Sequence, residues 1–477
     1  MTLEQIRALL PLIILVGAAV AIMLGLAVRR NHAFTVAVAV GSLAAAILSL
    51  ALGPTVATPI TPLLRLDGFS VFFSGLILAA SLFVAVLSHG YWNRRRTVIS
   101  EEFYILLLLA AAGSVTLTMA VHFASFFLGL EILSGSLYAM IAYERDRQAA
   151  VEAGIKYLVL AGGSSAVLLF GMALVYARTG TLDMAAAAAK LAGALDVLTL
   201  AGVAMILVGI GFKLALAPFH LWAADVYEGA PAPTAAYAAT VSKGAIFALL
   251  VRLAAAMDIQ SNPPFQATLA AAAVITMFAG NLLALRQSNL KRLLAYSSIA
   301  HMGYLLVAFL AAGTLGRTAV GFYLAAYIIT TLGVFAVMIV LSGTERDADR
   351  LEDYIGLSRA HPLLAAVFAG MLLSLAGLPL TAGFVGKFYL LAAGVGAHLW
   401  VLVAALVISS TISLFYYLRF IAAAYAQPAA PPALPAAVAM PRLARLAIAV
   451  LVILLLWLGV YPAAVIRAIQ EAVAIGR

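Results

Sequence analysis

The chain has 477 residues, of which 65% are hydrophobic and only 10% are charged. Soluble globular domains carry about 25% charged residues, so this composition excludes an ordinary soluble protein. The formal net charge of +9 does not indicate nucleic-acid binding, because the basic residues lie mostly in short segments between apolar runs, as topology signals do. The chain has no cysteine, which excludes thiolate-bound metals, iron–sulfur clusters and disulfides.

Apolar runs long enough to cross a bilayer recur along the whole chain. A spanning helix needs about 20 predominantly apolar residues, and the short alternating strands of a membrane β-barrel are absent. The predicted spans cover residues 8–28, 33–52, 69–89, 103–121, 123–143, 152–177, 197–222, 233–256, 266–286, 292–312, 318–342, 362–392, 398–426 and 443–466. The sequence therefore predicts an all-α polytopic membrane protein with about 14 transmembrane helices.

Lysine and arginine divide unequally between the two sides of these spans. Of the 28 Lys and Arg residues, we count 16 after odd-numbered spans, 8 at the termini and after even-numbered spans, and four inside spans. Cytoplasmic loops carry the excess of Lys and Arg. Both termini are therefore predicted to lie on the side away from the cytoplasm.

The seventh and twelfth predicted spans contain helix-breaking residues. The seventh reads GIGFKLALAPFHLW from Gly209, and the twelfth reads LAGLPLTAGFVGKF from Leu375. Proline removes a helical hydrogen bond and glycine loosens the turn, so we expect both helices to be discontinuous near mid-membrane. A blander alternative is that glycine and proline are simply common in membrane helices.

The two interruptions are five spans apart, which predicts two inverted five-helix repeats, spans 4–8 and 9–13. An odd number of spans in each unit forces the second copy to insert upside down. The predicted organisation is an N-terminal three-helix segment (1–102), a first repeat (103–257), a second, inverted repeat (258–426), and a linker with the last span (427–477).

Four ionisable residues lie well inside predicted spans: Glu131, Lys213, Lys243 and Lys387. Charges at membrane depth are expensive and mark ion pathways. Burial disfavours the charged form of a lysine and a nearby carboxylate favours it, so such a residue can load and release a proton. We predict that these residues pass protons laterally through water and through His220, because histidine titrates near neutrality.

Lys156 and His301 are further candidates for proton transfer. Lys156 lies near a span end beside Glu152 and could instead reach the membrane interface. Glu131 and Lys213 could instead form a static ion pair that fixes helix packing. No phosphate-binding loop, metal-ligand spacing or nucleophile motif emerges, so the chain is predicted to perform no covalent catalysis.

Two segments between spans stand apart by composition. Residues 344–354, TERDADRLEDY, carry mixed charge and are expected to form a solvated turn or, alternatively, a contact with another subunit. Residues 426–441 are rich in proline and alanine and predict an extended connector outside the bilayer.

Several long motifs resemble the antiporter-like membrane subunits of respiratory complex I, the NADH:quinone oxidoreductase. They are FLGLEILSGSLYAMIAY from Phe127, GFKLALAPFHLWAADVYEGAPAPTAAYAATVSKGA from Gly211, NLLALRQSNLKRLLAYSSIAHMGYLL from Asn281, LEDYIGLSRAHP from Leu351 and LPLTAGFVGKFYLL from Leu378. Within that family the chain is most similar to the bacterial subunit N group, because a sister group typically has glutamate at the position of Lys387.

The resemblance implies fourteen spans, inverted repeats, broken helices 7 and 12, and proton translocation coupled to quinone reduction elsewhere in the complex. It matches Glu131, Lys213, Lys243 and Lys387 to a central hydrophilic axis, and His220 to the histidine of the PFHLW motif. It implies that this chain contributes to an enzyme as a subunit but binds no cofactor, because NADH, FMN, iron–sulfur clusters and quinone are handled by other subunits.

The implied partners are other membrane-arm subunits, including neighbouring antiporter-like subunits, and the lipid bilayer, with no nucleic acid. The implied location is the bacterial inner membrane, with both termini on the periplasmic side. A subunit of a multi-subunit Na+/H+ antiporter is the main alternative, because it shares the repeat and the lysines. A hydrogenase membrane arm is a third possibility, whereas a solute permease would need a pocket of mixed polar groups.

Overall fold

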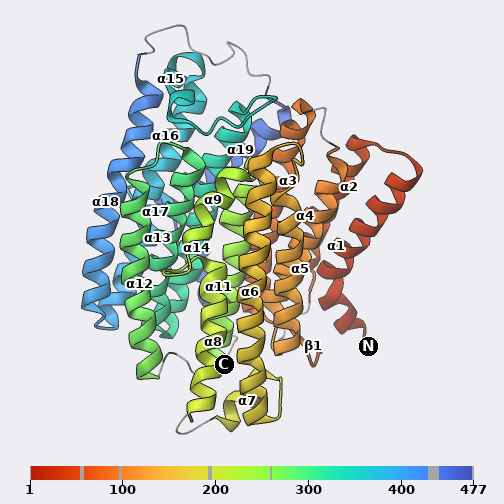
Figure 1. The fold of residues 1–477 in the computed structure, drawn as a ribbon, viewed down its shortest axis with the longest axis vertical. Coiled ribbons are helices and arrows are strands. Elements are labelled where there is room, and N and C mark those ends of the chain that lie inside the picture. The colour runs from red at the N-terminus through yellow and green to blue at the C-terminus, as the bar shows by residue number, and fades with distance from the viewer. Residues whose placement is uncertain are drawn as a thin grey trace.

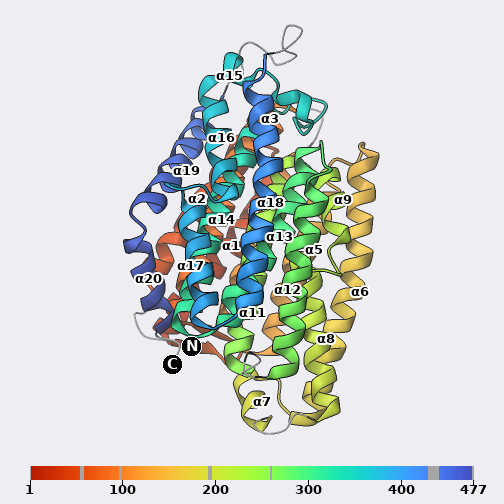
Figure 2. The ribbon, with the colours of Figure 1, turned by 90° about the vertical axis from the view of Figure 1, so that its left-hand side faces the viewer.

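The computed structural model describes residues 2–53, 58–95, 99–191, 196–257, 260, 262–427 and 440–474. It is a bundle of long helices that run roughly along one direction (Figures 1 and 2). In chain order the elements are α1 (Leu3–Val28), α2 (His32–Ala51), β1 (Thr58–Thr61), β2 (Leu64–Leu66), α3 (Gly68–Arg94), α4 (Glu101–Met119), α5 (Phe123–Ile141), α6 (Gln148–Thr179), α7 (Met184–Lys190), α8 (Val197–Leu214), α9 (Leu221–Gly229), α10 (Ala232–Tyr237), η1 (Ala238–Ser242), α11 (Lys243–Met257), α12 (Pro263–Ala284), α13 (Leu290–Ala311), α14 (Gly313–Leu341), η3 (Leu351–Tyr354), α15 (Leu357–Ala360), α16 (Pro362–Ala376), α17 (Ala382–Gly396), α18 (Trp400–Tyr425), α19 (Arg442–Val460) and α20 (Ala463–Ala474).

Among the described residues, 13 helices are long and apolar enough to cross a membrane, with α10, η1 and α11 counted as one. The shorter apolar helices α16 and α17 follow one another inside the predicted twelfth span, so together they bring the candidate spans to the predicted number of about 14. The predicted all-α polytopic class is confirmed. Each backbone group of a helix bonds within the segment, which is why helices suit a medium without water.

The spanning helices differ in how much of their surface lies inside the bundle. In α13 and α14, every residue of the most apolar stretch is buried inside the protein, whereas in α1 only 22% is. Helix α13 is less apolar than α1, with a mean hydropathy of 1.7 against 2.8, and it carries the buried polar residues Ser297, Ser298 and His301, which would be costly in contact with lipid. Figure 1 accordingly shows α14 within the bundle and α1 at its edge.

Two helices end inside predicted spans. Helix α8 ends at Leu214, where Ala215 adopts a left-handed conformation (φ 57°), and α9 begins at Leu221. Helix α16 ends at Ala376 and is followed by Gly377, whose φ of 89° suits glycine because it has no Cβ, and α17 begins at Ala382. The inverted relation between the two five-helix segments and the domain boundaries stay predictions.

Three short elements were not expected from the sequence. The antiparallel hairpin of β1 and β2 connects α2 to α3, the short helix α7 follows α6, and α20 follows the last span. All three are shorter than a spanning helix, so a search for apolar runs of about 20 residues does not detect them. Most of the predicted connector at 426–441 lies outside the described residues.

A buried ion network joins loops at the end of the bundle that carries α15. Arg95 donates to Glu144 and, over 2.8 Å, to Asp347, while Lys291 donates over 2.9 Å to both Asp347 and the carbonyl of Ala230. The charged side chains of this network are at most 5% exposed. The predicted solvated turn is therefore wrong for Asp347, although residues 343–346 of the same loop are exposed.

Replacing Asp347 with asparagine is expected to destabilise the protein by about 3–5 kcal/mol, because it leaves buried cations without their counter-ion. Burial raises the pKa of the Asp347 carboxyl, but Lys291 and Arg95 outweigh it and lower that pKa to about 2. The ionised group therefore stabilises the fold fully above about pH 4 and loses this effect as pH falls toward 2.

Thermal unfolding of the detergent-solubilised protein would measure this difference. The wild-type advantage over Asp347→Asn should be constant near neutral pH and shrink below about pH 4. Glu102→Gln is a suitable control, since Glu102 pairs with Arg30 at a surface where both side chains are more than 40% exposed. Equal losses in the two variants would contradict the role given to Asp347.

Candidate functional site

Lys213 lies in the last turn of α8 and is only 2% exposed. The C-terminal carbonyls of a helix carry partial negative charge, which favours a cation there. The Lys213 Nζ donates to the Ser134 Oγ on α5 over 2.7 Å and lies 6.0 Å from the centre of the Tyr157 ring. An aromatic face attracts a cation without neutralising it.

Side chains from neighbouring segments satisfy the backbone where α8 ends. The Trp222 indole donates to the carbonyl of Phe212 over 3.0 Å, and the amide of Ala217 donates to the Thr276 hydroxyl over 2.9 Å. His220 is 9% exposed at the start of α9, and its Nδ1 has no hydrogen-bond partner within the described residues. His220 thus lies at the interruption, as predicted from its position after the proline.

Lys243 begins α11 directly after the π-helical segment η1 and is 1% exposed. Its Nζ donates to the Ser298 Oγ on α13 over 2.6 Å and lies 5.9 Å from the centre of the Tyr227 ring. Segments of π-helix are rare and occur often at functional sites.

Lys387 lies on α17 and reaches across the second interruption. Its Nζ donates to the carbonyl of Ala376, the last residue of α16, over 2.8 Å and to the Ser410 Oγ on α18 over 2.7 Å. The centre of the Tyr304 ring is 5.4 Å away. A second lysine is therefore held at the C-terminal end of an interrupted helix.

The three lysines share one kind of environment. Each donates to a serine hydroxyl on a different helix and faces a tyrosine ring within about 6 Å. Of the ion pairs shorter than 4.0 Å in the described part of the chain, none includes Lys213, Lys243 or Lys387. These buried cations lack direct counter-ions, which is the costly arrangement that membrane proteins restrict to functional positions.

Glu131 is partly exposed on α5 and accepts a hydrogen bond from the Ser165 hydroxyl on α6 over 2.6 Å. A direct ion pair between Glu131 and Lys213, one of the two readings of the sequence, is not present in the described residues. Ser134, the partner of Lys213, lies three residues after Glu131 and hence on the same face of α5. The carboxylate is therefore near the first lysine but not bonded to it.

His301 lies on α13 one turn after Ser298 and is 3% exposed. Its Nδ1 is 2.6 Å from the Tyr323 hydroxyl, and its Nε2 is 3.3 Å from the Tyr417 hydroxyl on α18. Its ring also meets the ring of Tyr304 edge-on, with the centres 5.3 Å apart. Since Tyr304 faces Lys387 and Ser298 binds Lys243, His301 lies between these two lysines.

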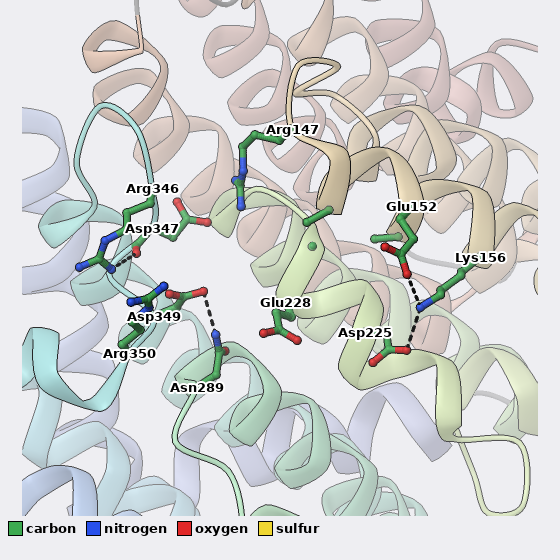
Figure 3. Close-up of a pocket in the computed structure, with 13 residues that line it drawn as sticks. Arg147, Glu152, Lys156, Asp225, Glu228, Asn289, Arg346, Asp347, Asp349 and Arg350 are labelled. Carbon is green, nitrogen blue, oxygen red and sulfur yellow. Dashed lines mark hydrogen bonds and ion pairs between the residues drawn. The ribbon is translucent and has the colours of Figure 1, made fainter.

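Lys156 belongs to a different environment. Its side chain is 45% exposed and pairs with Glu152 over 2.6 Å and with Asp225 over 3.3 Å. It lines a polar cavity of about 340 Å³ formed by α6, α9 and the loops around residues 289 and 346–350 (Figure 3). Arg292 pairs with the same Asp225 at 2.8 Å. The structure therefore does not bring Lys156 into contact with the three buried lysines.

The serine and tyrosine partners were not found from the sequence. Serine is common in membrane helices, so Ser134, Ser298 and Ser410 carried no signal of their own. The spacings Glu131 to Ser134 and Ser298 to His301 are both helical, but they become meaningful only once a lysine from another helix is seen to reach them. The described residues contain no group of three or more His, Asp or Glu side chains that could hold a metal ion.

Three comparisons relate the chain to known proteins. A family model described as NADH:quinone oxidoreductase/Mrp antiporter, TM, matches residues 120–413. The NADH-quinone oxidoreductase subunit N of Methylococcus capsulatus is 49% identical over 437 residues, covering 90% of this chain and 88% of that protein. The subunit N of Ectopseudomonas mendocina is 45% identical over 479 residues, covering 99% and 97%.

A solved structure shares the fold along almost the whole chain. A chain in the structure "Respiratory complex I from Thermus thermophilus with bound Aureothin" superposes with a TM-score of 0.83 at 35% sequence identity. The match covers 97% of this chain and 99% of that chain.

Proposed function

Since the chain belongs to the NADH:quinone oxidoreductase/Mrp antiporter family of membrane proteins, we propose that it is the antiporter-like, proton-translocating subunit of an NADH:quinone oxidoreductase. The chain moves protons, and quinone reduction in other subunits supplies the energy. The observation that carries this proposal is the row of three buried lysines without direct counter-ions. A lysine in such surroundings can exist in either protonation state, which a proton carrier requires.

The proposed route runs from Glu131 through Lys213 and Lys243 to His301 and Lys387. Serine hydroxyls contact each lysine, and tyrosine hydroxyls contact His301. Water completes the gaps between these groups, because protons move along chains of hydrogen-bonded donors and acceptors.

His220 and Lys156 take supporting positions in this proposal. The Nδ1 of His220 at the first interruption is buried without a hydrogen-bond partner in the described residues, so a water molecule that enters there would find a group able to exchange a proton with it. Lys156 lies at the polar cavity, where it is suited to the exchange of protons between the aqueous phase and the first half of the route.

The free energy needed to move one proton across the membrane can be compared with the free energy of a single lysine–serine hydrogen bond. Moving one proton against about 180 mV costs about 4 kcal/mol. One hydrogen bond to a charged group contributes about 1.5–3 kcal/mol. Breaking a single lysine–serine hydrogen bond therefore supplies too little free energy to move one proton against this potential. Hydration of the lysine or the approach of the Glu131 carboxylate must contribute as well.

The alternative of a Na+/H+ antiporter subunit receives weaker support. The family description includes Mrp antiporters, but the two relatives at 45–49% identity are both named as subunit N of NADH-quinone oxidoreductase. Purifying the tagged chain with its complex is expected to recover NADH:quinone reductase activity, and NADH-driven proton pumping should not require Na+. Recovery of Na+/H+ exchange without NADH oxidation would overturn the assignment.

We further propose that the complex lies in the bacterial inner membrane with neighbouring antiporter-like subunits beside this chain. Both termini are proposed to be periplasmic, which is supported by the excess of Lys and Arg after odd-numbered spans. Figures 1 and 2 show the start of α1 and the helix α20 away from the end that carries α15. A C-terminal reporter active only in the cytoplasm would contradict this orientation.

No resident cofactor is proposed for this chain. NADH, FMN, iron–sulfur clusters and quinone are assigned to other subunits. The chain would then contribute the proton path alone, with residues 103–257 and 258–426 as its two repeats.

A further inference from the structure

Each buried lysine has a serine hydroxyl as its side-chain hydrogen-bond partner. The distances from lysine Nζ to serine Oγ are 2.7 Å for Lys213, 2.6 Å for Lys243 and 2.7 Å for Lys387. The three serines come from α5, α13 and α18, so the pattern arises at three separate helix contacts. Buried serines that meet no lysine in the described residues, such as Ser88 and Ser136, donate to a carbonyl of their own helix; Ser298 also donates in this way, to Ala295, but its oxygen accepts from Lys243 as well.

A hydroxyl differs from the other available partners in one respect. It is both a donor and an acceptor, whereas a carboxylate only accepts when ionised and a carbonyl only accepts. A serine can therefore accept from a lysine ammonium and, after rotation of its O–H, donate to the neutral amine. A carboxylate in the same place would favour the charged lysine and retain its proton.

We propose that Ser134, Ser298 and Ser410 are positioning residues that hold Lys213, Lys243 and Lys387 in place in both protonation states. This inference rests on the proposed function of the lysines as proton carriers. When a lysine gives up its proton to the next carrier, the hydroxyl turns from acceptor to donor and no covalent bond changes. The amine stays in position to receive the next proton.

Ser298 offers the sharpest test, because it is the hydrogen-bond partner that the structure shows for the Lys243 ammonium. Lys387 also has the carbonyl of Ala376, and Lys213 lies near Glu131. The loss of the Ser298 hydroxyl should therefore change the behaviour of Lys243 without compensation from a second partner.

NADH-driven proton pumping by the assembled complex should fall as pH rises and Lys243 can no longer take up a proton. In Ser298→Ala, we expect this fall to occur at a pH about one unit lower than in the wild type. Both protonation states lose a hydrogen bond, but the charged lysine loses the stronger one, because a bond to a charged group is about twice as strong as a bond between neutral groups, and the difference is equivalent to about tenfold. Ser298→Thr keeps the hydroxyl and should retain the wild-type pH profile. Ser88→Ala is the matched control, since Ser88 is fully buried and the hydrogen bond that the described residues show for it goes to the Val84 carbonyl of its own helix.

Ser298→Asp tests the same idea from the opposite side. The new carboxylate should pair with Lys243 and keep it charged, so the complex assembles but pumps poorly at every pH. Wild-type pH profiles for both Ser298→Ala and Ser298→Asp would overturn the inference. Equal impairment of Ser298→Ala and Ser298→Thr would also overturn it, because that result indicates a packing role.

A second pair of variants keeps the test decisive if changes at Ser298 impair assembly. Ser134 and Ser136 are both buried on α5, but only Ser134 contacts a lysine. A shifted pH profile for Ser134→Ala and none for Ser136→Ala supports the inference, and unchanged profiles for both contradict it. Normal pumping by Lys243→Met would contradict the proposed proton route itself. Normal pumping by the serine variants with impaired pumping by Lys243→Met would leave the route in place and contradict only the positioning role of the serines.

Discussion

Replacing Lys213 with alanine is expected to abolish most NADH-driven proton pumping while the complex still assembles. Lys213 is the buried cation nearest Glu131 along the proposed route, and its Nζ is held by Ser134 at the end of α8. A positioned group that transfers protons contributes about 10²–10⁴-fold to the rate of a step. The proton-to-electron ratio in vesicles that carry the complex would measure the loss, alongside the amount of assembled complex.

Two other substitutions at the same position separate charge from proton release. Arginine keeps the positive charge but does not deprotonate in proteins, so Lys213→Arg should pump as poorly as Lys213→Met if Lys213 must release its proton. Wild-type pumping by the arginine variant would mean that only the charge is needed. Lys190→Ala is the control, because the hydrogen bond that the described residues show for Lys190 on α7 goes to the backbone carbonyl of Thr179.

Normal pumping by Lys213→Ala would assign Lys213 a structural role and require another route. Loss of pumping together with loss of assembly would indicate that Lys213 supports helix packing. The absence of a direct ion pair with Glu131 argues against a large packing role, because there is no salt bridge for the substitution to break.

Lys243→Met is expected to change pumping and stability in opposite directions. Lys243 is 1% exposed and has no carboxylate within 4.0 Å among the described residues, so its removal leaves no uncompensated charge behind. Replacing a buried charge by an apolar side chain of similar length is often neutral or stabilising, by about 1–4 kcal/mol. The variant should therefore pump at least about tenfold more slowly but unfold at an unchanged or higher temperature.

This combination distinguishes a functional lysine from a structural one. Asp347→Asn is the natural comparison, because Asp347 is equally buried but bonded to two cations, and its loss should lower stability. A Lys243→Met complex that is both less stable and inactive would contradict the proposal for Lys243. A stable complex with normal pumping would remove Lys243 from the route.

Both predictions depend on whether a buried charge has a direct counter-ion. In the proposed function, the lysines can act as proton carriers because no direct counter-ion fixes their charge, and for the same reason we expect them to add little to the stability of the fold. The cytoplasm-facing loops, as we propose them, show the converse, since Arg95, Lys291 and Asp347 neutralise one another and hold segments together. In the proposed function, one chain thus uses buried charge for proton transfer in its centre and for holding segments together at its end.

The sequence by itself determined the class of fold and the candidate carriers. Apolar runs of about 20 residues can cross a membrane only as helices, because every backbone group must find its partner inside the segment. Lys213, Lys243 and Lys387 stood out because a lysine inside such a run is costly wherever its partners are. Proline and glycine likewise marked the ends of α8 and α16, since their effect on a helix is local.

Only the tertiary structure decided which groups surround those lysines. Lys213 meets a serine 79 positions earlier in the chain, and Lys243 meets one 55 positions later. Such contacts depend on which helices are neighbours and how each is rotated, and a hydropathy pattern that is apolar on all sides specifies neither. The same holds for Asp347, which reads as part of a hydrophilic loop until folding brings Arg95 and Lys291 to it and removes all three from water.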